Sequence, residues 1–143
     1  MNNSNLNLLL VDDDDVAAES VTRSLRKHNV PCEPVWAENG EVALQILRNE
    51  HPDKHVSEPR IILLDLNMPR MNGFEFLEEL RHDSKLRSSV VFVLTTSDAE
   101  SDRTRAYHEN IAGYMVKAAV GPQFAKLATL IADYCTSVKL PPG

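Results

Sequence analysis

Five short apolar runs divide the chain, at residues 6–11, 31–37, 61–64, 90–94 and 114–116. The first, third and fourth are apolar at nearly every position rather than alternating, which is typical of strands covered on both faces. The second run contains Pro31 and Pro34, which favour an edge strand. We expect its tryptophan, Trp36, to be partly buried in the core.

Segments with helical periodicity lie between and after these runs. Their apolar residues repeat at spacings of three and four: Val21 and Leu25; Ala43, Ile46 and Leu47; Leu77 and Leu80; and Phe124, Leu127, Ala128, Ile131, Tyr134 and Cys135. The last set forms the clearest apolar stripe. These spacings predict amphipathic helices.

Two of the expected helices begin with a capping-box pattern. Asn72 followed by Glu75 is one such pair, and Ser97 followed by Glu100 is the other. The helix predicted after Ser97, over residues 99–108, is unusually polar. Asp14 or Asp15 is expected to cap the first helix.

Strands that alternate with helices predict a parallel sheet with helices on both faces. The five units fill residues 1–143 as a single domain, and residues 137–143 are expected to form a short tail without an output domain. The polar connection at residues 49–60 is expected to be a surface loop.

Composition narrows the function. The formal net charge is −6, and no basic stretch is present, which argues against nucleic-acid binding. No apolar run is long enough to span a membrane, and residues 1–5 lack a basic signal region. Cys32 and Cys135 are expected to be core residues in a reducing cytoplasm.

The predicted strands end in residues that could form one reactive site. Asp12 and Asp13 follow the first strand, Asp65 the third, Thr95 the fourth and Lys117 the fifth. Ligands of parallel sheets bind outside the carboxyl ends of the strands. Clustered carboxylates suit a hard divalent ion, and a phosphoryl group could use the metal, the ammonium and the hydroxyl together. An aspartate can also be the nucleophile that accepts the phosphoryl group.

Four stretches at these strand ends resemble the receiver domain of two-component response regulators. They are LLVDD at residues 9–13, LLDLNMPRMNG at 63–73, VLTTS at 93–97 and GYMVK at 113–117. The resemblance implies a flavodoxin-like α/β fold with sheet order 2-1-3-4-5. It covers essentially the whole chain. Because no output domain is expected, the chain resembles stand-alone regulators of the chemotaxis type or phosphorelay intermediates. The loop at residues 52–59 is similar to that of regulators paired with bacterial phytochromes.

The resemblance also assigns a metal site and an acceptor. Asp65 corresponds to the phospho-acceptor, Asp13 to a direct ligand of Mg²⁺ or Mn²⁺, and Asp12 to a ligand acting through water. Asn67 would offer its backbone carbonyl to the metal. Gly73 fits the tight connection into the third helix.

The family's switch residues have counterparts as well. Thr95 resembles the hydroxyl that closes on the phosphoryl group, Lys117 the ammonium that pairs with it, and Tyr114 the aromatic that moves inward. The family usually has proline after this lysine, with a cis peptide between them, whereas this chain has Ala118. A cis bond there would cost about 2.5–4 kcal/mol, so either a strained cis or a trans bond remains open.

The resemblance implies a cytoplasmic signalling protein rather than an enzyme. A sensor histidine kinase or a phosphotransfer protein would supply the phosphoryl group. A surface formed by the fourth helix, fifth strand and fifth helix would then bind a downstream protein, with neither nucleic acid nor membrane as a partner. Some members of the family form homodimers, and the sequence leaves this open.

Each residue taken alone has a simpler interpretation. The acidic run could be a helix start, Asp65 a turn residue, Thr95 a strand residue, Lys117 a solvated charge and Tyr114 a core aromatic. Two other functions are also compatible with the pattern. One is a pseudo-receiver that binds partners without phosphorylation. The other is a magnesium-dependent phosphohydrolase resembling the haloacid dehalogenase class, although that class usually has aspartate where this chain has Asn67.

Overall fold

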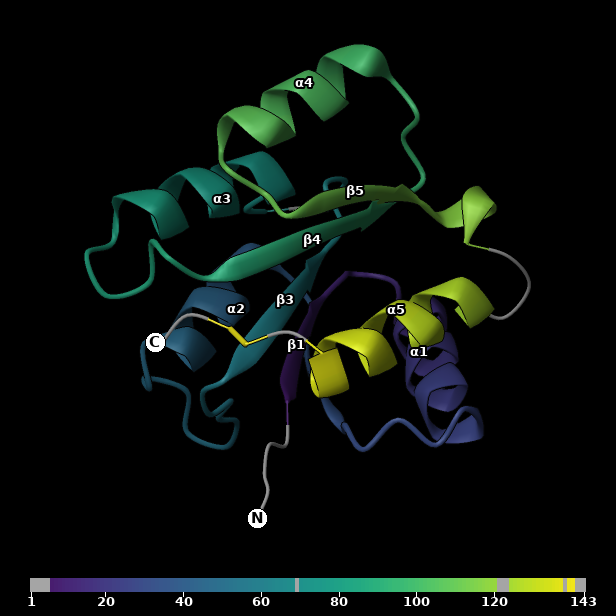
Figure 1. Cartoon of the computed structure of the whole chain (residues 1–143). Helices are drawn as coiled ribbons and strands as arrows, with labels where there is room; N and C mark the ends of the chain where they lie inside the picture. The colour runs from purple at the N-terminus through teal and green to yellow at the C-terminus, as the bar shows by residue number, and fades with distance from the viewer. Residues whose placement is uncertain (1–5, 69, 121–123, 138, 141–143) are drawn as a thin grey trace.

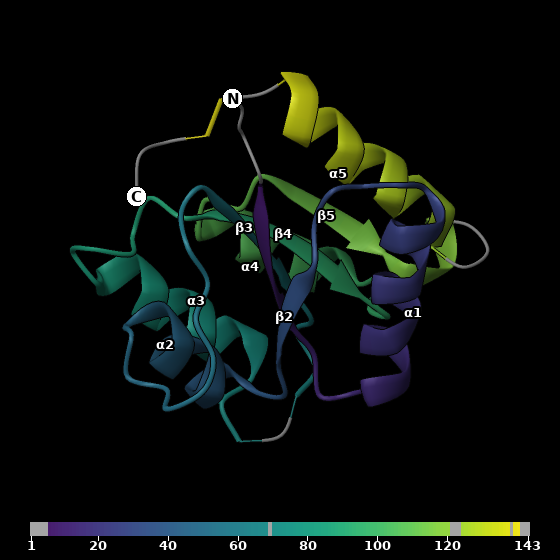
Figure 2. The same cartoon turned by 90° about the horizontal axis from the view of Figure 1, so that it is seen from below.

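The computed structural model describes residues 6–68, 70–120, 124–137 and 139–140. Its parallel strands are β1 (Asn7–Val11), β2 (Pro34–Ala37), β3 (Arg60–Leu64), β4 (Val90–Thr95) and β5 (Gly113–Val116). They form a five-stranded sheet in the order β2-β1-β3-β4-β5. Figure 1 labels β1, β3, β4 and β5 in this sheet, and Figure 2 labels β2. The predicted order and the edge position of β2 are therefore confirmed.

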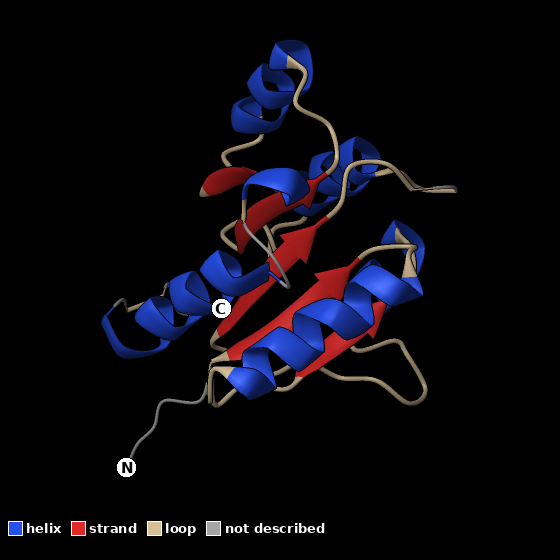
Figure 3. Cartoon of the chain, turned by 90° about the vertical axis from the view of Figure 1, so that its right-hand side faces the viewer, coloured by secondary structure: helices blue, strands red, loops and turns tan. Residues whose placement is uncertain are grey.

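Helices cover both faces of this sheet. They are α1 (Asp15–Lys27), α2 (Gly40–Leu47), α3 (Gly73–His82), α4 (Glu100–His108) and α5 (Ala125–Ser137), with a short 3₁₀ helix at Lys117–Ala119. Figure 2 shows α1 and α5 on one side and α2 and α3 on the other, and Figure 3 shows the sheet between these layers. None of the helices in these ranges has the length and apolar character needed to cross a bilayer.

Two apolar cores result from the alternation of side chains along the buried strands. Leu9, Ile62 and Val93 face the core beneath α2, α3 and α4. Leu8, Ile61 and Phe92 face the opposite core, which α1 and α5 cover. The central strands are therefore buried on both faces, which explains why their sequences are continuously apolar.

The helix starts agree with the sequence in two cases and differ in a third. Asp14 caps α1, and Asn72 and Glu75 form the predicted capping box of α3. Ser97 does not cap α4, which begins at Glu100 after an N-cap residue without a side-chain hydrogen bond. The prediction for Ser97 was wrong, because its hydroxyl donates to Asp102 at 2.6 Å and accepts from the N–H of Ala99, which lies before the helix, at 3.3 Å.

The N-terminal residues and part of the predicted C-terminal tail lie outside the described residues. Residues 1–5, Val138 and residues 141–143 lie outside them, and Ser137, the first residue of the expected tail, belongs to α5. The predicted loop is observed between α2 and β3. The strands align so that Val11 pairs with Leu64, and this register brings the following aspartates to one edge of the sheet.

Candidate functional site

Three carboxylates meet at the carboxyl ends of β1 and β3. Asp12, Asp13 and Asp65 each offer an oxygen, and these oxygens lie within 4.8 Å of one another. Asp12 and Asp65 are only 2% and 6% exposed, whereas Asp13 is open to solvent. Oxygen ligands at this separation, with one exposed side for water, fit a hard divalent cation such as Mg²⁺ or Mn²⁺.

The backbone holds both buried carboxylates in register. The N–H of Asp65 donates to the Val11 carbonyl at 2.9 Å, and the N–H of Asp12 donates to the Ala37 carbonyl at 3.1 Å. These bonds continue the sheet ladder by one residue beyond the strands. Each acid is thus placed by a central strand rather than by a loop.

Lys117 reaches the carboxylates from the end of β5. Its Nζ lies 2.9 Å from Asp12 Oδ2 and 3.5 Å from Asp65 Oδ2. Among the described residues the cis peptide bond is Glu58–Pro59, so the bond after Lys117 is trans. The alternative left open by Ala118 is thereby decided, and a trans bond still allows the ammonium to reach both acids.

Burial and charge act in opposite directions on this cluster. Burial raises the pKa of Asp12, against the lowering influence of the Asp14 N–H and of Lys117. Burial alone would lower the pKa of Lys117, but the hydrogen bond and charge of Asp12, with the charge of Asp65, raise it. Lys117 therefore stays protonated and neutralises part of a site that carries excess negative charge.

Thr95 and Tyr114 lie at the next two strands along the sheet. Thr95 is fully buried, and its Oγ1 accepts a 3.4 Å contact from the Ser97 N–H. Tyr114 is half-buried, and its hydroxyl donates to the Ser97 carbonyl at 3.0 Å. The segment that follows β4 is thus tied to both residues, and through the Ser97 hydroxyl to Asp102 of α4.

Asn67 and Gly73 shape the loop that follows Asp65. The N–H of Asn67 donates to Asp65 Oδ1 at 3.2 Å, and its side chain is exposed. A Cβ on Gly73 would lie 2.6 Å from the Cα of Leu66 and 2.7 Å from the carbonyl oxygen of Asp65. Only glycine allows this approach of two backbones, which supports the tight connection predicted there.

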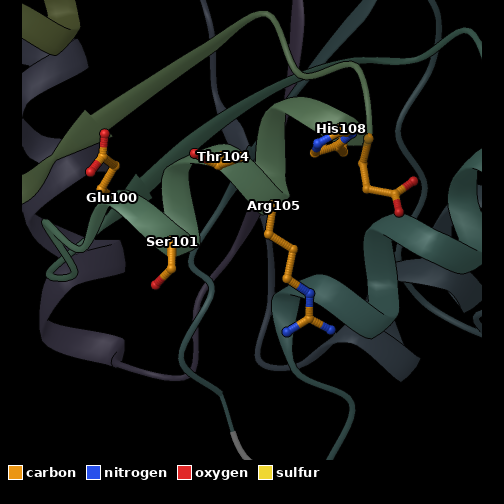
Figure 4. A pocket seen from close by; sticks show the side chains of 6 residues that line it. Glu100, Ser101, Thr104, Arg105 and His108 are labelled. Carbon is orange, nitrogen blue, oxygen red and sulfur yellow. The ribbon is translucent and has the colours of Figure 1, made fainter.

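A surface pocket lies along α4. It is lined by Glu100, Ser101, Thr104, Arg105, His108 and Glu109 (Figure 4). Arg105 extends from the helix, and its guanidinium carbon lies 4.0 Å from the centroid of the Phe74 ring in α3. Ala106 is the buried residue of α4, so this polar helix has a narrow apolar contact with the rest of the molecule.

Sequence reasoning missed two residues next to the site. The indole N–H of Trp36 donates to the Asp12 carbonyl, and the Lys54 ammonium donates to the Trp36 carbonyl. No local sequence signal marks either contact, because the partners are 24 and 18 residues apart. Sheet pairing and the fold of the loop bring them together.

Comparisons with known proteins give a family match for most of the chain. The sequence model of the response regulator receiver domain matches residues 8–129. The chain is 31% identical to the probable methanogenesis regulatory protein FilR2 of Methanothrix harundinacea, over 95% of this chain and 87% of that protein.

Solved structures with similar folds include two regulators. The phosphorylated cyanobacterial phytochrome response regulator RcpA superposes with a TM-score of 0.84 at 31% identity, over 97% of this chain and all of that one. The Mn²⁺-bound form of response regulator Rcp1 gives a TM-score of 0.80 at 28% identity, over 95% and 99% of the two chains.

Proposed function

The chain belongs to the response regulator receiver family, and we propose that it accepts a phosphoryl group on Asp65 in the presence of Mg²⁺ or Mn²⁺. The observation that carries this proposal is the arrangement around Asp65. Two further carboxylates lie within 4.8 Å, and the Lys117 ammonium lies 3.5 Å away. Phosphoryl transfer depends mainly on positioning and on neutralisation of charge, and this site offers groups for both.

The proposed step moves one phosphoryl group between two carriers. An oxygen of the Asp65 carboxylate attacks phosphorus, and the bond from phosphorus to the donor's histidine nitrogen breaks. The electron pair of that bond stays on the imidazole, and the product is an acyl phosphate. Asp12, Asp13 and Asp65 would hold the metal with the backbone carbonyl of Asn67, and the bound ion supplies positive charge beside the phosphoryl oxygens.

Lys117 and Thr95 respond to the new charge. The Lys117 ammonium exchanges part of its contact with Asp12 for a contact with a phosphoryl oxygen on Asp65, since it already lies close to both carboxylates. The Thr95 hydroxyl donates to another oxygen of the same group. The Ser97 N–H contacts the Thr95 hydroxyl, and the Ser97 carbonyl accepts from the Tyr114 hydroxyl. Movement of Thr95 therefore displaces the segment that leads into α4.

Phosphorylation then controls a protein-binding surface on α4, β5 and α5. The narrow apolar contact of α4 means that its displacement costs little, which favours a shift between existing conformations. The donor is a sensor histidine kinase or a phosphotransfer protein in the cytoplasm. The similarity to RcpA makes phytochrome-class kinases the first donors to test.

Intact mass spectrometry tests the chemistry directly. The protein is incubated with acetyl phosphate and Mg²⁺, beside Asp65→Asn, a metal-free sample with chelator and Asp15→Asn as a matched control. Asp15 is an exposed acid in the first turn of α1, outside the carboxylate cluster. We expect one phosphoryl adduct on the wild type and on Asp15→Asn, and none in the other two samples.

Two results would contradict the proposal. An adduct that persists in Asp65→Asn would place the phosphoryl group elsewhere. No adduct on the wild type, together with no spectral response to beryllofluoride, would favour a pseudo-receiver. Turnover of a generic phosphate ester by the wild type would instead support the phosphohydrolase alternative.

A further inference from the structure

We propose that Trp36 and Lys54 are positioning residues that hold the peptide between Asp12 and Asp13 in the orientation that metal binding requires. The inference rests on the proposed function, because it concerns the metal site used there. It assigns a role to the loop between α2 and β3 and to the edge strand β2. Neither contributes a side chain to the carboxylate cluster itself.

Both backbone groups of Asp12 are held by β2. Its N–H donates to the Ala37 carbonyl at 3.1 Å, and its carbonyl oxygen accepts from Trp36 Nε1 at 2.7 Å. That carbonyl belongs to the peptide unit whose nitrogen is that of Asp13. Rotation of this unit would swing the exposed Asp13 carboxylate relative to the buried Asp12, so the indole hydrogen bond fixes the separation of the two acids.

Lys54 in turn holds Trp36 at the open edge of the sheet. Its Nζ donates to the Trp36 carbonyl at 2.6 Å and lies 5.5 Å from the centroid of the indole ring. Because β2 is the edge strand, the ammonium supplies a hydrogen bond there without a further strand. The contact combines a charge-assisted hydrogen bond with a cation–π interaction.

His51 positions Lys54 within the loop between α2 and β3. The Nδ1 atom of His51 accepts from the backbone N–H groups of Asp53 and Lys54, at 3.1 and 3.0 Å. These bonds close a turn immediately before the lysine side chain departs. The contacts therefore run without interruption from His51 through Lys54 and Trp36 to Asp12.

The arrangement supplies its own spectroscopic probe. Trp36 is the single tryptophan of the chain, and its N–H bonds directly to the backbone of Asp12. A cation bound by Asp12 and Asp13 places positive charge beside this held peptide, and the environment of the indole changes with it. We expect Mg²⁺ to change the tryptophan emission of the wild type saturably, with a midpoint equal to the Mg²⁺ dissociation constant from calorimetry.

Affinity for Mn²⁺, measured from the paramagnetic resonance signal of the free ion, tests the positioning role. Trp36→Phe keeps an aromatic ring and removes the donor, and we expect binding to weaken about two- to tenfold, the range for loss of one neutral hydrogen bond. Val35→Ala is the matched control, since Val35 lies on the same strand and packs in the opposite core. We expect it to bind Mn²⁺ within about twofold of wild type.

Lys54→Met separates positioning from electrostatics by the sign of its effect. Loss of a positive charge near a cation site would by itself tighten Mn²⁺ binding. Loss of the hydrogen bond from Lys54 to the Trp36 carbonyl weakens Mn²⁺ binding, whereas Lys54→Arg, which keeps the charge and a donor, retains it. Unchanged or tighter binding in Lys54→Met, wild-type affinity in Trp36→Phe, or equal weakening in Val35→Ala would each overturn the inference.

Phosphorylation of the wild type distinguishes this inference from the proposed function. If the wild type gains the Asp65 adduct while Trp36→Phe retains full Mn²⁺ affinity, the proposed function stands and the positioning role of Trp36 is refuted. A wild type that binds Mn²⁺ in a manner dependent on Trp36 but never accepts a phosphoryl group would do the reverse.

Discussion

The ammonium of Lys117 lies closer to Asp12 than to Asp65, at 2.9 Å against 3.5 Å. The cation at the end of β5 is therefore engaged first with a metal-ligand candidate and only second with the phospho-acceptor candidate. Its side chain is 15% exposed, so solvent screens this contact little. The Lys117 ammonium and a bound dication are both positive and both interact with Asp12. The ion pair between Lys117 and Asp12 therefore weakens the binding of a cation.

Removal of this ammonium should separate metal binding from phosphorylation. In Lys117→Met we expect Mg²⁺ to bind about tenfold more tightly, because one positive charge near the dication is lost. Adduct formation from acetyl phosphate should nevertheless be slower. Calorimetry measures the first effect and intact mass against time the second. Lys85→Met, at an exposed position after α3, is the control, and weaker Mg²⁺ binding in Lys117→Met would contradict the argument.

Thr95→Ala should disconnect phosphorylation from the surface change. We expect the Asp65 adduct to form while the accompanying change in hydrogen exchange over α4 falls several-fold, because the buried hydroxyl is the link to Ser97. Thr96→Ala is a matched control, since the neighbouring hydroxyl is exposed. An exchange response in phosphorylated Thr95→Ala equal to that of wild type would refute the role of this hydroxyl.

Arg81 should be a major stabilising residue, although it lies far from the site. Its guanidinium donates to four backbone carbonyls, those of Arg87, Ser89, Glu109 and Asn110, at 2.6–3.0 Å. Burial lowers its pKa, but four acceptors compensate for the cost of desolvation. We expect Arg81→Met to lose about 2–4 kcal/mol of unfolding free energy in urea. Arg87→Met, with an exposed side chain, should lose less than about 0.5 kcal/mol.

Cys32 should be unreactive in the folded protein. Burial raises the pKa of its thiol to about 12, with smaller contributions from Cys135 and Glu33. At pH 8 the thiolate fraction is then about one in ten thousand. Because the folded pKa is raised, the protonated form is favoured in the folded state, and the associated stability is lost as the pH rises from about 9 toward 12.

A thiol-reactive chromophore measures this directly in a Cys135→Ser background. The native rate should rise about tenfold per pH unit between pH 9 and 11, whereas the rate for urea-unfolded protein should level off in that range. A native rate equal to the unfolded rate at pH 8 would show that Cys32 is accessible and that its pKa is ordinary.

The sequence alone determined the architecture and the family. Continuous apolar runs at the central strands identified a sheet buried on both faces, because a strand with covered faces has no position at which water favours a polar side chain. The residues at the carboxyl ends of the strands, Asp12, Asp65, Thr95 and Lys117, could be grouped from the sequence, since parallel strands bring their carboxyl ends to one edge of the sheet. Local capping was predictable where it depends on neighbours, as at Asn72.

Only the tertiary structure decided which of these groups touch. It placed Lys117 nearer Asp12 than Asp65, gave the peptide before Ala118 its trans geometry, and turned the Ser97 hydroxyl to Asp102 instead of a capping box. It also joined Trp36 to Asp12. These outcomes depend on packing between segments distant in sequence, where several partners compete for each donor, and local pattern does not fix which partner prevails.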